Sequence, residues 1–194
     1  DLLSRLVTNT EQALTTSFDI VFAERDRTGS DVLSEQYSAN SDLIKELKKI
    51  KPNDRVFAES MESHSTVVLG SAPNNKLITE DISPKYGLII QGDSPKEFLP
   101  KYTGMQNNLP TLIDSSAGVG SMSIGGNSSI VRSLPTFEVV NGQIVPSLML
   151  ETLRVAIGAS TYQIKSSNAS GELAFGESTG INNVKLGNVI IPTN

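Results

Sequence analysis

Helical and strand patterns alternate along the first 70 residues, and this alternation decides the fold class more than any other property of the chain. Apolar residues over 1–15 recur at the i, i+3, i+4 and i+7 spacing of an amphipathic helix. Residues 17–22 alternate with the period of a strand. A second amphipathic helix is expected over 41–51, capped by Ser41, and 66–70 is an apolar run typical of the next strand. This order predicts an α/β fold with a parallel pair of strands.

Turn signals divide the second half of the chain. Asn141-Gly142 predicts a tight hairpin between 136–140 and 143–145, because both turn positions need positive φ. A helix is expected over 147–158, and short strands are expected from 161 to 192. The apolar face of that helix is expected to carry Met149, Leu153, Ala156 and Ile157.

Residues 72–110 differ in composition from the segments around them. Five of the nine prolines lie here, and apolar residues come only in short groups. A loop this long inside a domain is usually functional or variable. We therefore predict a single domain over 1–194, with a mixed β-sheet flanked by amphipathic helices and an irregular insertion at 72–110. A cavity bordered by this insertion is the candidate ligand site.

Composition excludes several classes of function. The chain has no cysteine, so a disulfide scaffold, a zinc finger, an iron–sulfur site and a thiol nucleophile are ruled out. Its formal net charge is −5, which argues against nucleic acid as a partner. A single histidine supplies a transition-metal site poorly, and we predict neither metal nor cofactor. The aliphatic runs are far shorter than the roughly 18 residues of a membrane span.

Three patterns carry weak signals of chemistry. His64, the only histidine, lies among serines, but no G-x-S-x-G motif places a nucleophile, so we expect no catalysis. Gly118-Val119-Gly120 resembles half of a dinucleotide fingerprint, with Ser123 in place of the third glycine. Small residues packed under a helix explain it better. Three acidic residues surround one turn without the order of a calcium loop, and we expect a solvated connection there: Glu24, Asp26 and Asp31.

Two charged residues interrupt segments with strand character. Asp19 lies within 17–22, and Arg132 interrupts the apolar stretch 130–134. A buried charge without a partner is costly, so we expect the two to form a structural ion pair. The alternative is that Asp19 or Arg132 faces a ligand.

Three stretches in order carry a family resemblance. The first is 18–27, a strand followed by an acidic turn. The second is 109–135, with a Leu-Pro helix start, a glycine-containing strand and the sequence Ile130-Val131-Arg132. The third is the helix start at 146–148 with the late Ile190-Ile191-Pro192. Together they resemble the extracellular sensory domain associated with cyclases and histidine kinases, CHASE type two, although Asn127-Ser128-Ser129 replaces the family's usual Asp-Gly.

The resemblance implies a non-catalytic signal-input domain on the extracytoplasmic side of a bacterial cytoplasmic membrane. Membrane helices absent from this chain would flank it, and the cytoplasmic output would be a cyclase or a kinase, as in two-component signal transduction. A small molecule or a protein would be the signal. A homodimer is possible, and Leu2, Leu3, Leu6 and Val7 would then contribute to its interface or to packing on the sheet. The alternatives are a structural, dimerising ectodomain that recruits a protein, and a hydrolase centred on His64.

Overall fold

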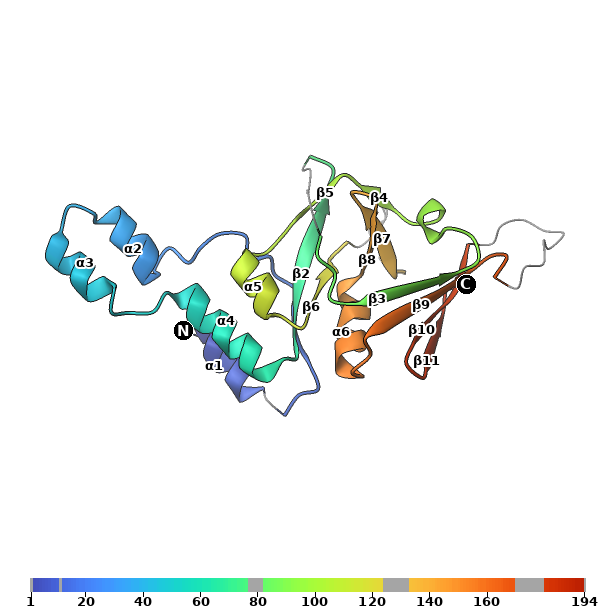
Figure 1. Cartoon of the computed structure of the whole chain (residues 1–194), viewed down its shortest axis with the longest axis horizontal. Helices are drawn as coiled ribbons and strands as arrows, with labels where there is room; N and C mark the ends of the chain where they lie inside the picture. The colour runs from blue at the N-terminus through green and yellow to red at the C-terminus, as the bar shows by residue number, and fades with distance from the viewer. Residues whose placement is uncertain (1, 11, 77–81, 124–132, 170–179, 194) are drawn as a thin grey trace.

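The computed structural model describes residues 2–10, 12–76, 82–123, 133–169 and 180–193 (Figure 1). It confirms the α/β fold class. The helices are α1 (Leu2–Asn9), α2 (Ser30–Gln36), α3 (Ser41–Leu47), α4 (Asn53–His64), α5 (Pro110–Ser115) and α6 (Leu148–Ala156), with a 3-10 turn η1 (Pro95–Glu97). The strands are β1 (Thr16–Phe18), β2 (Val67–Asn74), β3 (Gly87–Gln91), β4 (Lys101–Tyr102), β5 (Gly104–Gln106), β6 (Gly118–Ser121), β7 (Phe137–Val140), β8 (Gln143–Pro146), β9 (Thr161–Ser166), β10 (Ile181–Leu186) and β11 (Val189–Pro192).

The strands form three small sheets. In the first, β2 pairs in parallel with β1 and β6 and antiparallel with β5. The second has the order β11-β10-β9-β3, and the third has the order β4-β7-β8. Thr16 lies opposite Val67, and Phe18 lies opposite Leu69. The parallel pair predicted from the first 70 residues is therefore confirmed.

The helices at the N-terminal end cover the first sheet. α1 and α5 both pack on α4 (Figure 1). Their shared core joins side chains of these helices to those of β1 and β2: Val7, Phe18, Phe57, Ala58, Met61, Val67, Leu69 and Leu112. The sequence patterns did not predict α4. Pro52 is the N-cap of α4, a position its fixed φ suits.

Two elements predicted within the first 22 residues are shorter in the structure. The helix expected over 1–15 ends at Asn9, and the strand expected over 17–22 ends at Phe18. After Phe18 the chain leaves the sheet, and the Phe22 amide donates to Oδ1 of Asn108 at 2.7 Å. Ile20 is consequently exposed, while the Phe18 and Phe22 rings remain in edge contact at 5.8 Å.

The apolar side chains of α1 lie in two different environments. Val7 is buried, and Leu3 packs against the core of the N-terminal helices. Leu2 and Leu6 remain 79% and 45% exposed. Two of the four apolar residues considered on this helix, Leu3 and Val7, are therefore explained by packing in the core that covers the first sheet.

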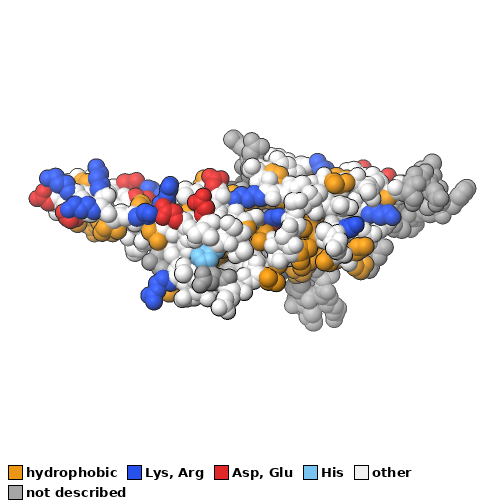
Figure 2. All heavy atoms as spheres, turned by 60° about the horizontal axis from the view of Figure 1, so that its bottom comes forward, with side chains coloured by type: hydrophobic (Ala, Val, Ile, Leu, Met, Phe, Trp, Pro, Cys, Tyr) orange, Lys and Arg blue, Asp and Glu red, His pale blue; other side chains and the backbone are white. Residues whose placement is uncertain are grey.

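α2 and α3 project from the rest of the molecule, and charged side chains of both signs gather on this end (Figures 1 and 2). They form surface ion pairs, among them Arg25–Glu35 at 2.8 Å and Lys49–Glu46 at 2.6 Å. Water and salt screen such exposed pairs, so they stabilise the fold little. The helix expected over 41–51 ends at Leu47, and its cap is Asn40 rather than Ser41, because Oδ1 of Asn40 accepts from the Leu43 amide.

The expectation of an irregular insertion at 72–110 is wrong for the described part of that segment. It contains β3, η1, β4 and β5 as well as the end of β2. β3 pairs in parallel with β9, and β4 pairs in parallel with β7. These partners lie far along the chain, so the local sequence pattern gave no sign of the pairing.

The turn predictions in the second half are confirmed. β7 and β8 form an antiparallel hairpin around Asn141 and Gly142, whose φ values are 46° and 78°. β10 and β11 form another around Gly187-Asn188. A second core lies between these strands and α6, and its largest buried members are Phe137, Leu150, Tyr162, Ile164 and Leu186.

α6 has the predicted limits but a different buried face. Oγ of Ser147 caps it by accepting from the Leu150 amide at 3.3 Å. Met149 and Ile157 are 54% and 41% exposed, whereas Leu150, Glu151 and Arg154 are buried. The predicted apolar face is therefore wrong for Met149 and Ile157, whereas Leu153 does pack against the core. The helix also buries a charged pair, which a hydrophobic pattern cannot indicate. In the described part of the chain, no helix combines the length and hydrophobicity that a membrane span needs.

β6 lies directly beneath α6, as the small-residue explanation of 118–120 predicted. A Cβ on Gly120 would lie 2.5 Å from Cα of Leu148 and 2.7 Å from its nitrogen. Gly120→Ala should therefore push α6 away from the sheet and lower the free energy of unfolding by about 1–3 kcal/mol. Urea unfolding measures this change, with Ser94→Ala, an exposed substitution, as the control. Equal midpoints for the two variants would contradict the close packing.

Candidate functional site

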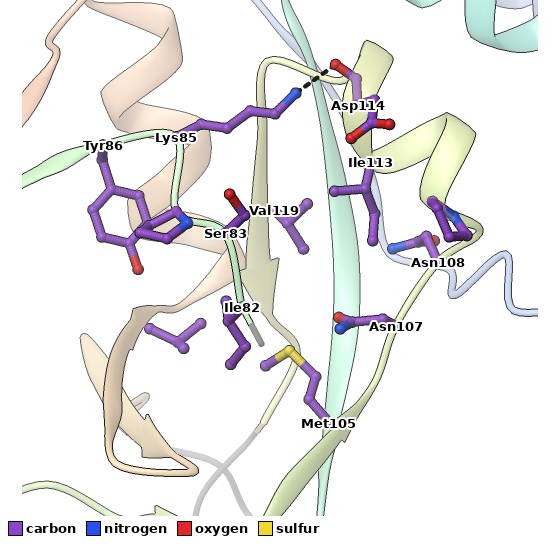
Figure 3. Close-up of a pocket in the computed structure, with 13 residues that line it drawn as sticks. Ile82, Ser83, Lys85, Tyr86, Met105, Asn107, Asn108, Ile113, Asp114 and Val119 are labelled. Atoms are coloured by element: carbon purple, nitrogen blue, oxygen red, sulfur yellow. Dashed lines mark hydrogen bonds between the residues drawn. The ribbon is translucent and has the colours of Figure 1, made fainter. Parts of the chain in front are cut away.

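A pocket of about 300 Å³ lies where the first sheet meets the segment that leads into β3 (Figure 3). Residues 82–86 form one wall, and α5, β5, β6 and β8 supply the others. Its apolar lining is Ile82, Pro84, Met105, Pro110, Ile113, Val119 and Val145. Its polar lining is Ser83, Lys85, Tyr86, Asn107, Asn108 and Asp114. Nine of these residues belong to the 72–110 segment that the sequence analysis marked as the border of a candidate ligand site.

Lys85 spans one edge of the pocket and reaches the C-terminal end of α5 (Figure 3). Its Nζ donates to the main-chain oxygens of Asp114 at 2.7 Å and Ser116 at 2.5 Å. Partial burial lowers the pKa of this ammonium group, and the charge of Asp114 acts in the opposite direction. Lys85 forms no ion pair with a carboxylate of the described residues.

Two other polar side chains hold the walls in place. Asn108 is buried, and its amide donates to the main-chain oxygen of Gly70 at 2.8 Å. The Tyr86 hydroxyl donates to the main-chain oxygen of Ile144 at 2.7 Å. Burial, and secondly the charge of Glu151, raise the pKa of Tyr86. Asn107 also lines the pocket, and its side-chain amide makes no hydrogen bond with any described residue.

A buried ion pair lies behind the Tyr86 wall. Glu151 is fully buried, and its carboxylate accepts from Nε and Nη2 of Arg154 at 2.9 and 2.6 Å. The Tyr162 hydroxyl donates to the same carboxylate at 2.5 Å. Arg154 also donates to the main-chain oxygens of Ala159 and Ala117, which ties α6 to the segments that directly precede β9 and β6.

The Glu151 carboxylate affects the pKa values of Arg154 and Tyr162. Burial by itself would lower the pKa of Arg154, but the hydrogen bonds and charge of Glu151 outweigh it and raise that pKa. Burial raises the pKa of Tyr162, and the negative charge of Glu151 raises it further. The sequence patterns did not predict this buried pair. The i, i+3 spacing of Glu151 and Arg154 was the available signal, and on a helix that spacing usually marks a solvated pair.

A second buried carboxylate lies on β7. Oε2 of Glu138 accepts from the Ser121 hydroxyl, and its Oε1 has no hydrogen-bond partner within the described structure. Glu138 does not line the pocket described above.

The structure separates Asp19 from the candidate pocket. Asp19 follows the end of β1, its side chain is exposed, and it borders a different hollow of about 390 Å³ beside α6. An exposed carboxylate needs no partner, so the reason for expecting one is removed. Arg132 lies outside the described residues, and the ion pair between Asp19 and Arg132 stays a prediction.

His64 and the acidic turn also lie away from the pocket. His64 ends α4, and its Nδ1 is 2.7 Å from the main-chain oxygen of Ser60. Asp26 accepts from the amide and hydroxyl of Thr28 and from the Asn53 amide, and these hydrogen bonds lower its pKa. Asp31 lies 3.4 Å from Arg25. Within the described residues, no three His, Asp or Glu side chains converge to hold a metal ion.

Comparison with known proteins finds no matching family model, no matching curated protein and no matching solved structure.

Proposed function

We propose that this chain is the signal-input domain of a bacterial transmembrane receptor. It lies on the extracytoplasmic side of the membrane and controls a cytoplasmic cyclase or kinase. The order of the three CHASE-like stretches supports this proposal. The domain itself binds its signal and catalyses no reaction.

The observation that carries the proposal is the pocket between the first sheet and residues 82–86. Small-molecule sites are typically concave, mostly apolar and provided with a few polar groups that orient the ligand. Here apolar side chains from four elements face one cavity, and Lys85, Asn107 and Asp114 add the polar groups. Its volume is at the lower end of the roughly 300–1,000 Å³ usual for ligand pockets. The signal is accordingly a small metabolite.

The packing around the pocket suggests how binding could be transmitted. α5 forms one wall, packs on α4, and α4 packs on the N-terminal helix α1. A ligand shifts a conformational equilibrium only by its difference in affinity for the two states. A state in which α5 closes on the ligand would reach α1 through α4.

A thermal-shift screen of the 194-residue chain against metabolites, ions and cell-wall fragments tests the proposal. A ligand at about 100 times its Kd adds about 2.7 kcal/mol to stability, which raises the Tm of a domain this size by roughly 5–10 °C. Ser83→Trp fills the pocket and should abolish the shift. Ser94→Trp, an exposed serine outside the pocket, should keep it.

Two results would count against this function. A shift that survives Ser83→Trp would place the ligand elsewhere. A screen without any saturable shift would favour the dimerising ectodomain that recruits a protein partner.

A further inference from the structure

We propose that the pocket binds a free α-amino acid with an apolar side chain, an inference that rests on the sensory function proposed above. Lys85 binds the carboxylate, Asp114 binds the ammonium group, and the apolar walls enclose the side chain.

The cation at the pocket edge is only partly satisfied. Lys85 Nζ has three N–H donors, and two of them donate to main-chain oxygens at the end of α5. These oxygens are neutral, and no described carboxylate pairs with the ammonium. Part of the side chain is removed from water, which lowers the pKa of Lys85. An incoming carboxylate would supply both the third hydrogen bond and a directly paired negative charge.

An acidic group lies at the same edge. Figure 3 shows the end of the Asp114 side chain next to the end of Lys85. The Asp114 carboxylate makes no hydrogen bond or ion pair with a described residue, and its negative charge acts on Lys85. The pocket edge thus carries one cationic and one anionic side chain, which lie near each other without forming an ion pair.

This arrangement selects the ligand by its charges. A simple carboxylate would gain from Lys85 but would meet the like charge of Asp114, and a simple amine would have the opposite difficulty. A zwitterion satisfies both groups. In an α-amino acid the two charges are separated by one carbon, which matches two side chains at one edge.

The remaining walls suit an apolar side chain. Ile82, Met105, Ile113 and Val119 face the cavity below the charged edge (Figure 3). A leucine-sized side chain that binds there is transferred from water into apolar surroundings. The free energy of this transfer is favourable and is proportional to the apolar area buried.

Calorimetric titration of the 194-residue chain tests the inference with three probes that share one side chain. L-leucine carries both charges, 4-methylpentanoate lacks the ammonium group, and 3-methylbutylamine lacks the carboxylate. L-methionine and L-phenylalanine extend the amino-acid set. We expect at least one of the three amino acids to bind, and L-leucine to bind about tenfold or more tightly than either truncated analogue, as the loss of a charge-assisted hydrogen bond predicts.

Variants assign the two charges. Lys85→Met keeps the aliphatic stem and should weaken amino-acid binding about tenfold or more, whereas Lys85→Arg should restore part of it. Asp114→Asn should reduce the preference for L-leucine over 4-methylpentanoate. Lys96→Met and Asp42→Asn, exposed charges outside the pocket, should change nothing. Thermal unfolding of each variant shows that it is folded.

The outcomes separate this inference from the proposed function. Equal affinity for L-leucine and 4-methylpentanoate overturns the zwitterion site, and so does an amino-acid affinity unaffected by Lys85→Met in a folded variant. A different metabolite whose shift is lost in Ser83→Trp, with no amino acid bound, overturns the inference and leaves the sensory function standing. The absence of any pocket ligand overturns both.

Discussion

Glu151→Ala should lower the free energy of unfolding by about 3–5 kcal/mol, the range for removing one partner of a buried ion pair. The substitution leaves Arg154, which is only 6% exposed, without its counter-charge. It also leaves the buried Tyr162 hydroxyl without its acceptor. Urea denaturation of the 194-residue chain measures the change. A loss of this size is a large fraction of the stability of an ordinary domain.

The controls distinguish a buried charge from a helical pair at the surface. Glu46→Ala removes a partner from the exposed Lys49–Glu46 pair, which has the same i, i+3 spacing, and should leave the stability nearly unchanged. The double variant Glu151→Leu/Arg154→Met removes both charges and should lose less stability than Glu151→Ala. A double variant less stable than Glu151→Ala would mean that the pair itself, rather than the unpaired arginine, carries the effect.

Phe57→Ala should also cost about 3–5 kcal/mol, because it opens a cavity in the core of the N-terminal helices. The ring is 2% exposed and lies in edge contact with Phe18 and Phe22, with centroid distances of 5.7 and 5.4 Å. Phe57→Leu keeps most of the volume and should lose less than about 1.5 kcal/mol. Chemical denaturation measures both.

Tyr37→Ala is the matched control, because it truncates an aromatic ring that is 49% exposed. It should shift the denaturation midpoint far less than Phe57→Ala. Similar shifts for the two aromatic truncations would contradict the central place of Phe57 in this core.

The elements that sequence predicted well are those whose signals are local. Asn141-Gly142 formed the expected turn because the backbone conformation there depends on these two residues alone. The limits of α6 follow from the cap at Ser147 in the same way. β3 and β4 were missed because each pairs with a strand from the distant second half of the chain.

The candidate site was predicted only in outline. Proline content directed attention to 72–110, and most of the pocket lining does come from there. The remaining lining residues, Ile113, Asp114, Val119 and Val145, come from three elements outside it, and only the tertiary fold brings them together. Lys85 and Asp114 are 29 positions apart, with nothing in the local sequence to connect them.

The described interior is divided into separate hydrophobic clusters, and this affects how the molecule loses its structure. The core around Phe57 and the core around Tyr162 share no described residue. Each half can therefore open locally at its own free energy, and amide hydrogen exchange would report two sets of protection factors. The pocket lies between these halves, so an occupant that contacts both would make their openings interdependent, and the two sets of exchange rates would slow together.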